Sequence, residues 1–218
     1  MRNIRAMAAC ALSLAATSTW ANGFDTLETR DSWRPFVGLG FTSGGDTMLK
    51  VNLVPKDGSG STYREDVSSG GGLDLRAGVS RRLGELPLTA QFAVAFHNDQ
   101  VNGIAGEKAR FRRVPIEATL LWHATDRARI GFGVRKALRP TFKVDNVKFA
   151  VDGQEVTASG KFDFKSSVGI IVEAEYALTP SWGLKGRYVF ESYRLRNDPQ
   201  GERFDANHLG VNSVWYFD

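Results

Sequence analysis

The sequence lacks any long hydrophobic run that could form a transmembrane helix, because no segment after its N-terminus approaches about eighteen consecutive apolar residues. Cysteine is represented only by Cys10, which excludes an intrachain disulfide and a cysteine metal site. Neither sign of charge dominates, since the formal net charge is +4, so nothing favours a nucleic-acid partner. If this chain enters a membrane, it must do so as a closed β-barrel, in which every backbone polar group is paired.

The N-terminus has the pattern of a secretory signal peptide. Arg2 and Arg5 precede an apolar stretch over residues 6–16, and a polar segment then ends at Ala21. Cleavage after Ala21 would remove Cys10 and two of the 28 basic residues, leaving 26 against 24 acidic ones and a charge of +2. We expect residues 1–21 to be the signal peptide, 22–32 a short periplasmic segment and 33–218 the barrel.

Strict alternation of apolar and polar residues predicts β-strands. In "VGIIVEAEYAL", residues 168–178, a period of two places the apolar side chains on one face and Glu173 and Glu175 on the other. The same pattern recurs seven times, over residues 33–42, 73–83, 88–97, 114–123, 129–135, 182–191 and 208–217. We therefore predict an all-β fold, an eight-stranded antiparallel up-and-down transmembrane β-barrel.

The connections between these strands alternate in length. Tight ones are expected near residues 84–87, 125–127 and 179–181, and long ones at 43–72, 98–109, 139–167 and 194–206. Tight periplasmic turns and long extracellular loops are typical of outer-membrane barrels. A soluble barrel such as a lipocalin has the same period with its faces inverted. Two features favour the membrane form: aromatic residues at strand ends on the apolar face, and glycines on the other face. The aromatic residues are Trp33, Trp122, Tyr176, Trp182 and Trp215.

A ten-stranded barrel is the alternative, because residues 142–164 contain an Asp-Gly turn between two strand-like arms. If the first arm crossed the membrane, either Lys148 or the pair Lys143 and Asp145 would face lipid, which costs about 2 to 4 kcal/mol for a lysine at the midplane. We therefore expect this segment, and likewise residues 46–67, to form hairpins that extend above the membrane.

The short turns also predict which charges meet inside the barrel. With a three-residue connection at 179–181, Leu178 lies opposite Trp182, so Glu175 faces Lys185 and Glu173 faces Arg187. The same construction over the other two turns sets Glu117 opposite Arg135 and Asp74 opposite His97. On the polar face as a whole, seven basic residues meet five acidic ones, Arg76, Arg82, Arg113, Arg129, Arg135, Lys185 and Arg187 against Asp74, Glu117, Glu173, Glu175 and Glu191. This composition predicts an ion-paired, largely closed lumen without a metal or cofactor.

The final segment, "LGVNSVWYFD", resembles the last strand of small outer-membrane barrels, which closes with alternating aromatic residues and a terminal phenylalanine. Gly210, Trp215 and Phe217 match this pattern, whereas Asp218 departs from it. With its four hairpins, the chain is similar to the eight-stranded group that includes the OmpA membrane domain, OmpX and OmpW. The resemblance implies an outer-membrane location and recognition of the last strand by the barrel-insertion machinery. We expect a monomer.

The sequence holds few residues suited to catalysis. The lipid A deacylase barrels require a serine two residues after a histidine, whereas Asp99, Thr125 and Gly210 occupy those positions after His97, His123 and His208. We predict no catalytic residues, although a lipid-modifying enzyme remains the most distant of the alternatives.

Arginines gather where the strands meet the long loops. Arg110, Arg112, Arg139 and Arg196 lie at that rim, and arginine suits bidentate contact with phosphate. The leading hypothesis is a non-enzymatic barrel whose loops bind lipopolysaccharide or an external partner. A narrow channel for small solutes or ions is the alternative.

Overall fold

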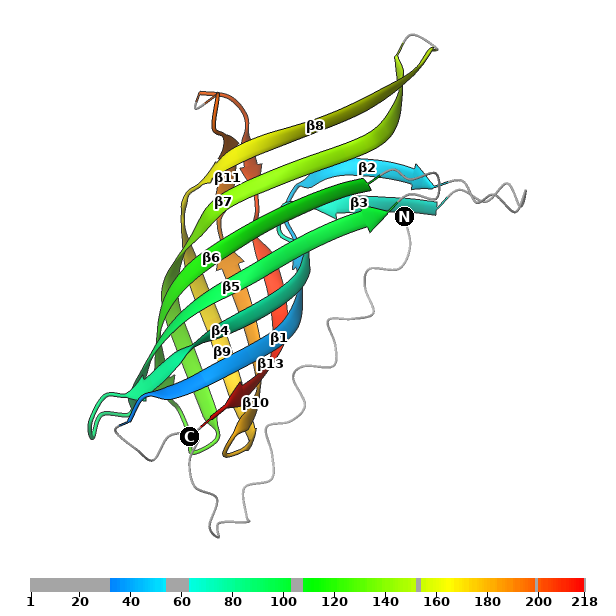
Figure 1. Cartoon of the computed structure of the whole chain (residues 1–218). Helices are drawn as coiled ribbons and strands as arrows, with labels where there is room; N and C mark the ends of the chain where they lie inside the picture. The colour runs from blue at the N-terminus through cyan, green and yellow to red at the C-terminus, as the bar shows by residue number, and fades with distance from the viewer. Residues whose placement is uncertain (1–31, 54–62, 103–107, 152–153, 199, 218) are drawn as a thin grey trace.

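The computed structural model describes residues 32–53, 63–102, 108–151, 154–198 and 200–217 (Figure 1). The described residues form thirteen β-strands and no α-helix. The strands are β1 (Arg34–Gly44), β2 (Thr47–Leu53), β3 (Tyr63–Ser68), β4 (Gly72–Arg82), β5 (Leu88–Asn102), β6 (Lys108–His123), β7 (Ala128–Val151), β8 (Gln154–Ser166), β9 (Val168–Thr179), β10 (Trp182–Phe190), β11 (Ser192–Leu195), β12 (Arg203–Asp205) and β13 (His208–Tyr216). No helix in these residues is long and apolar enough to cross a membrane.

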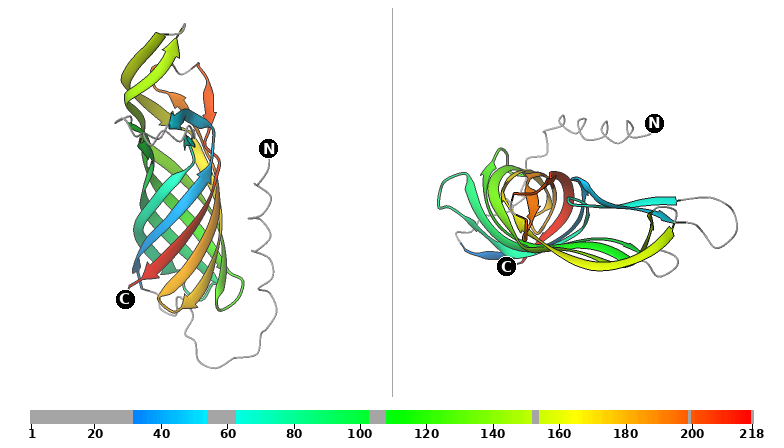
Figure 2. Two further views of the ribbon diagram at one scale, coloured as in Figure 1. Left: turned by 90° about the vertical axis from the view of Figure 1, so that its right-hand side faces the viewer. Right: turned by 90° about the horizontal axis from the view of Figure 1, so that it is seen from above.

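Eight antiparallel strands close into a barrel, as the sequence predicts. They follow one another in the order β7, β6, β5, β4, β1, β13, β10 and β9, and a direct pairing of β9 with β7 completes the ring. Figure 2 shows the strands inclined to the barrel axis and the ring from above. Closure removes the sheet edges, which in lipid would leave backbone groups unpaired.

The hairpin of β7 and β8 extends beyond the ring, so the ten-stranded alternative is wrong. The lower half of β7 pairs with β9, from Ala128↔Tyr176 to Lys136↔Val168, and its upper half pairs with β8 from Thr141↔Asp163 onward. The segment β2–β3 forms a second projecting hairpin, also as expected. Seen from above, both hairpins project to the same side of the barrel (Figure 2).

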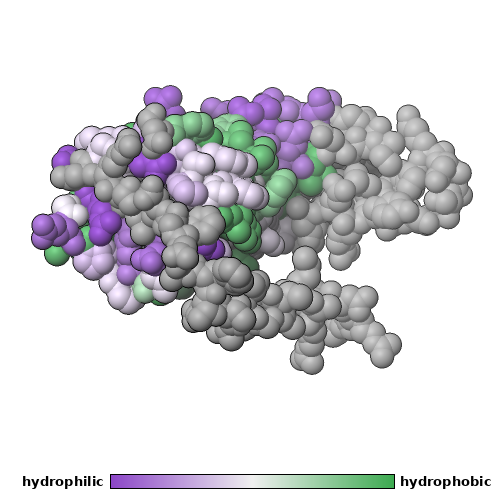
Figure 3. Space-filling view, turned by 90° about the horizontal axis from the view of Figure 1, so that it is seen from below, coloured by the Kyte–Doolittle hydropathy of each residue, from purple (hydrophilic) through white to green (hydrophobic). Residues whose placement is uncertain are grey.

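The alternation of each strand separates an apolar exterior from a charged interior. Along β9 the burial alternates residue by residue, with Val172 42% exposed and Glu173 3% exposed. Side chains on the outer face include exposed Phe41, Phe92, Phe132, Leu184 and Val211. In Figure 3, green hydrophobic side chains lie toward the middle of the visible surface among pale ones, and purple hydrophilic side chains are most frequent at the left and along the upper right. An apolar outer belt excludes the soluble, lipocalin-like form, whose charges would lie outside.

The other two long connections, at residues 98–109 and 194–206, also contain strands, which the sequence analysis missed. β5 continues to Asn102 and β6 begins at Lys108. In the last long connection, β11 begins at Ser192 and β12 spans Arg203–Asp205. These extensions enclose a hydrophobic cluster above the charged lumen, formed by Val67, Val101, Ala109, Phe111, Ala137, Phe142, Val144, Phe164, Tyr193 and Ala206. Burial in this cluster raises the pKa of Tyr193. The cluster holds the upper strands together beyond the ring.

A β-bulge at Arg139 reverses which face of β7 the even-numbered residues occupy. Arg139 has φ of 47°, and the register between β6 and β7 shifts between Arg112↔Thr141 and Val114↔Leu138. Pro140 follows and has no backbone N–H to donate. Even-numbered residues of β7 therefore face outward below the bulge, whereas Phe142 and other even-numbered residues face the cluster above it.

Candidate functional site: an ion-paired lumen

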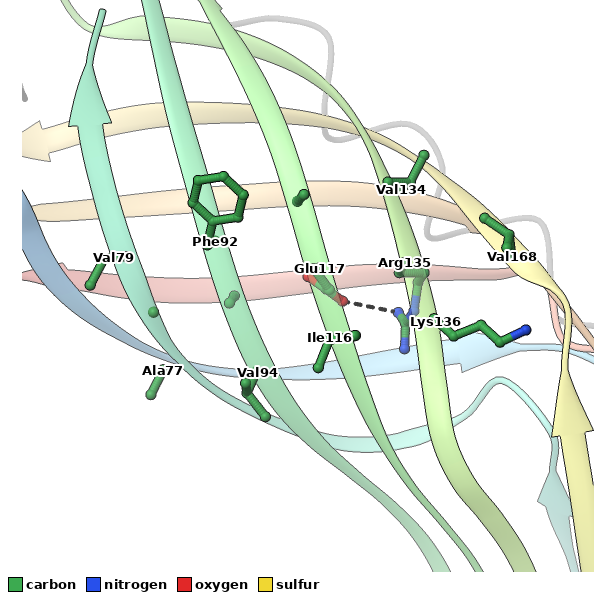
Figure 4. Close-up of a pocket in the computed structure, with 13 residues that line it drawn as sticks. Ala77, Val79, Phe92, Val94, Ile116, Glu117, Val134, Arg135, Lys136 and Val168 are labelled. Atoms are coloured by element: carbon green, nitrogen blue, oxygen red, sulfur yellow. Dashed lines mark ion pairs between the residues drawn. The ribbon is translucent and has the colours of Figure 1, made fainter.

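The lumen is lined by charged side chains that the strand alternation turns inward. All five acidic residues expected there, and six of the seven basic ones, are at most 7% exposed. Arg82, near the β4–β5 turn, is partly exposed. Figure 4 shows the inward pair Glu117 and Arg135 on adjacent strands, with Ile116 and Val134 projecting from the same strands. Each strand of the wall thus presents apolar side chains outward and charged side chains inward.

Glu173 and Glu175 share one lysine in the lower part of the lumen. Lys185 Nζ lies 2.9 Å from Glu173 Oε1 and 3.2 Å from Glu175 Oε2. Arg129 Nη2 donates to Glu175 Oε1 at 2.7 Å, and the Tyr216 hydroxyl donates to the same oxygen at 2.7 Å. Both carboxylates therefore have cationic partners inside the lumen.

Glu117 is the centre of the middle part of the lumen. Its Oε2 accepts from Arg187 Nη1 at 2.9 Å and from Arg76 Nη1 at 3.2 Å, and its Oε1 lies 3.3 Å from Arg135 Nη1. One carboxylate thus contacts three guanidinium groups from three strands. Arg76 also donates to Asp74, which supplies a second negative charge there.

Two histidines and loop backbone lie at the upper end of the lumen. The rings of His97 and His208 lie 5.7 Å apart, and His208 Nε2 is 3.4 Å from Arg135 Nη1. Arg113 donates to the Ser69 carbonyl, and the Ser69 hydroxyl donates to the Asp205 carbonyl at 2.5 Å. The segment before β4 is therefore bound across the top of the barrel.

The structure pairs the predicted lumen residues in the predicted register. Glu173 lies opposite Arg187, with Arg187 Nη2 3.2 Å from Glu173 Oε2, and Glu175 lies opposite Lys185. The remaining pairs are Glu117↔Arg135 and Asp74↔His97, the latter with 3.4 Å between His97 Nε2 and Asp74 Oδ2.

One detail of that register is wrong. Trp182 pairs with Thr179 rather than with Leu178, because the register shifts between Trp182 and Gly183. From Gly183↔Ala177 onward the pairing is as predicted, so the irregularity stays within the turn.

Sequence reasoning missed the partners that come from elsewhere in the ring. Arg129 lies directly opposite Glu175 across the β7–β9 pairing that closes the barrel. Arg76 and Arg187 reach Glu117 from strands that do not adjoin β6. The inward parity of these arginines was visible in the sequence, but their contacts depend on closure.

The four rim arginines do not form one group in the structure. Arg112 and Arg139 are exposed near the bulge, and the Arg112 guanidinium lies 5.3 Å from the Phe96 ring centroid. Arg110 is partly buried on β6 opposite Lys143, and exposed Arg196 follows β11. They are spread along the upper rim.

The residues assigned to the C-terminal insertion signal occupy both faces of the last strand. Gly210 is buried, and a Cβ there would lie 3.2 Å from Arg187 Cγ. Trp215 and Phe217 face outward, 38% and 48% exposed. The strand is anchored at its end, where Phe217 N donates to Pro35 O at 2.9 Å.

A closed antiparallel ring with an apolar exterior, a charged interior and short turns at one end is the architecture of a membrane-spanning barrel. The chain has the fold of the small outer-membrane β-barrels. No family model matches the chain, and no curated protein has a significantly similar sequence.

Solved structures of small outer-membrane barrels are similar to this chain at low sequence identity. Ail from Yersinia pestis, in complex with the heparin analogue sucrose octasulfate, aligns with a TM-score of 0.46 and 9% identity over 85% of this chain and 99% of Ail. Neisserial surface protein A aligns with a TM-score of 0.47 and 11% identity over 85% of this chain and 97% of that protein. For AlkL in lipid bilayers the TM-score is 0.39 and the identity 16%, over 93% and 96% of the two chains.

Proposed function

We propose that this protein is a non-enzymatic barrel of the outer membrane, with a closed lumen and upper strands that bind lipopolysaccharide or an external partner. The observation that carries the proposal is the buried charge network. Arg76, Arg135 and Arg187 converge on Glu117, and the side chains of all four are at most 3% exposed. A conducting pore needs water along its axis, whereas these groups bond to one another across it.

The histidines also support a role without catalysis. His97 is 1% exposed, with Nε2 3.4 Å from Asp74 Oδ2 and Nδ1 3.2 Å from Arg113 Nη2. His208 is 1% exposed, and its Nδ1 lies 2.7 Å from the Ala206 carbonyl oxygen. A general base must reach the proton that it abstracts. Among the described residues, no group of three or more acidic, histidine or cysteine side chains is placed to hold a metal.

The ends of the chain complete the proposal. Residues 1–21 would be removed as a signal peptide, residues 22–32 would lie in the periplasm, and the barrel-insertion machinery would read the strand that ends at Phe217. Residues 1–31 lie outside the described part of the chain. The mature barrel would act as a monomer.

The refolded protein is expected to give no steady channels in planar lipid bilayers. The physical reason is that an ion entering the lumen would have to displace buried ion pairs such as Lys185 with Glu173. Single-channel recording measures this directly, with empty detergent micelles as the background. Steady openings above that background would replace the closed barrel with the narrow-channel alternative.

Replacing Arg110, Arg112, Arg139 and Arg196 with glutamine is expected to lower the lipopolysaccharide that co-purifies with the folded barrel. Each arginine removed takes away a charge-assisted contact with phosphate. Quantifying phosphate and fatty acid per folded barrel checks this, and heat-modified gel mobility reports folding. Unchanged lipid at equal folded yield would leave these side chains as ordinary solvated charges.

A further inference from the structure

Three neighbouring strands above the membrane belt place three cations directly opposite one another. Lys165 on β8 pairs with Arg194 on β11, and Arg194 pairs in turn with Arg203 on β12. Adjacent strands lie about 4.8 Å apart, so the three backbone positions form one short row. We call these three residues the cation row.

All three side chains lie on the outer face of this small sheet. Their neighbours Phe164, Tyr193 and Phe204 pack into the hydrophobic cluster on the inner face. Because successive residues of a strand point to opposite faces, the cation row points outward. Lys165, Arg194 and Arg203 are each exposed.

The cation row borders a pocket of about 320 Å³. The lining holds three cations, three serines and one leucine, and no carboxylate: Lys165, Ser166, Ser167, Ser192, Arg194, Leu195 and Arg203. Like charges directly opposite one another in a sheet are destabilising. A ligand that brings negative charge into this pocket would relieve that repulsion.

Two acidic residues on these strands, Asp163 and Asp205, have donors of their own. Asp163 accepts from the Thr141 hydroxyl at 3.0 Å, a bond that lowers the pKa of Asp163, and it lies 3.4 Å from Lys161 Nζ. Asp205 accepts from the backbone N–H and the side-chain amide of Asn207 at 2.9 and 3.0 Å. Glu202 precedes Arg203 and is exposed, outside the pocket lining.

The cation row lies just above the apolar belt. Val168 and Ile170, which follow Lys165 along the chain, face outward and are 66% and 43% exposed. Phe190 on β10, which pairs with Ile170, is 48% exposed, and β11 begins two residues later. A group held by Lys165 and Arg194 would therefore sit at the level of lipid headgroups, with hydrocarbon directly below.

We propose that the cation row is a binding site for a phosphate monoester, presented by a lipid headgroup at the outer boundary of the membrane. Two arginines offer planar pairs of N–H donors that match phosphate oxygens, and the lysine adds a third charge. A phosphate monoester carries close to two negative charges at neutral pH, which suits three cations better than a single carboxylate does. The inference rests on the proposed outer-membrane location and adds a lipid contact that is separate from the four rim arginines.

The test compares thermal unfolding of the barrel in dodecyl maltoside micelles with increasing dodecyl phosphate. The wild type should gain a saturable increase in unfolding temperature. The double variant Lys165→Gln/Arg203→Gln should need at least about tenfold more dodecyl phosphate for half of that increase, since two charge-assisted contacts are lost. The matched control Lys108→Gln/Lys161→Gln removes the same charge from two exposed residues outside the pocket lining and should stay within about twofold of the wild type.

Reversing the charge of Lys165 should change the unfolding temperature in a direction that tests the site. Lys165→Glu places a carboxylate opposite Arg194, so without dodecyl phosphate this variant should unfold at a higher temperature than the wild type. Added dodecyl phosphate should then raise its unfolding temperature little or not at all. A lower unfolding temperature without ligand, or a full wild-type response to it, would overturn the site.

Inorganic phosphate distinguishes the two sources of the group. A response to dodecyl phosphate alone supports a lipid headgroup, whereas an equal response to inorganic phosphate would overturn the lipid source and leave a site for the soluble anion. Equal loss of response in the control double variant would mean general charge attraction and would also refute the proposal. None of these outcomes depends on the conductance measurement, so failure here leaves the closed-lumen function standing.

Discussion

Glu117→Gln is expected to lower the free energy of unfolding of the barrel by about 3 to 5 kcal/mol, because it strands buried guanidinium groups. Glu117 is the common partner of Arg76, Arg135 and Arg187. A glutamine has nearly the same shape, so packing is preserved while the negative charge is lost. Arg135 keeps Glu191 at 3.4 Å and Arg76 keeps Asp74, which sets an upper limit on the loss.

Urea titration of the barrel in lipid vesicles, followed by tryptophan fluorescence, measures this free energy. Glu85→Gln is the matched control, because Glu85 is exposed in the turn between β4 and β5 and its neutralisation should change the stability by less than about 0.5 kcal/mol. A Glu117→Gln barrel as stable as the Glu85→Gln control would show that the lumen arginines are solvated in the folded state.

Glu173→Gln and Arg187→Gln are each expected to destabilise the barrel, and the double variant should lose less than the sum of the single losses. The two side chains lie opposite each other, 3.2 Å apart, and both are nearly fully buried. Once one partner is gone, removing the other no longer strands a charge. Coupling of contacting residues is about 0.5 to 3 kcal/mol. Glu173 also contacts Lys185 and Arg187 also contacts Glu117, so each single variant keeps one ion pair of the remaining residue.

The measurement is a double-mutant cycle in the same vesicles. Glu173→Gln combined with Lys143→Gln is the control, because Lys143 lies on the upper half of β7 and bonds to Asp145. That combination should be additive within about 0.5 kcal/mol. Strict additivity of the Glu173 and Arg187 changes would contradict the pairing.

The interior charge network has a further consequence for stability. Replacing buried ion pairs with apolar residues is often neutral or stabilising, so the network is weak grounds for high stability. Here the network fills the lumen with charged groups that depend on one another for partners. Removing one member lowers the free energy of unfolding, although the complete network contributes little to it.

The sequence by itself determined the ring and its pairings between hairpin neighbours. A period of two is a local property, so each strand specifies its inward and outward face without knowledge of the rest. A short turn then fixes the register, as the pairing of Glu117 with Arg135 across residues 124–127 shows. The free-energy cost of placing Lys143 or Lys148 in lipid correctly predicted that the β7–β8 hairpin lies outside the membrane.

Only the tertiary structure decided which charges meet across the lumen and which cations meet above it. Arg129 reaches Glu175 through the strand pair that closes the ring, and Glu117 contacts Arg76 and Arg187 from two strands that do not adjoin its own. These contacts are set by the diameter and stagger of the barrel. The bulge at Arg139 reverses the alternation that local periodicity would continue, so the outward face above it could not be read from the pattern below. The row of Lys165, Arg194 and Arg203 likewise exists only because segments distant in sequence pair as β8, β11 and β12.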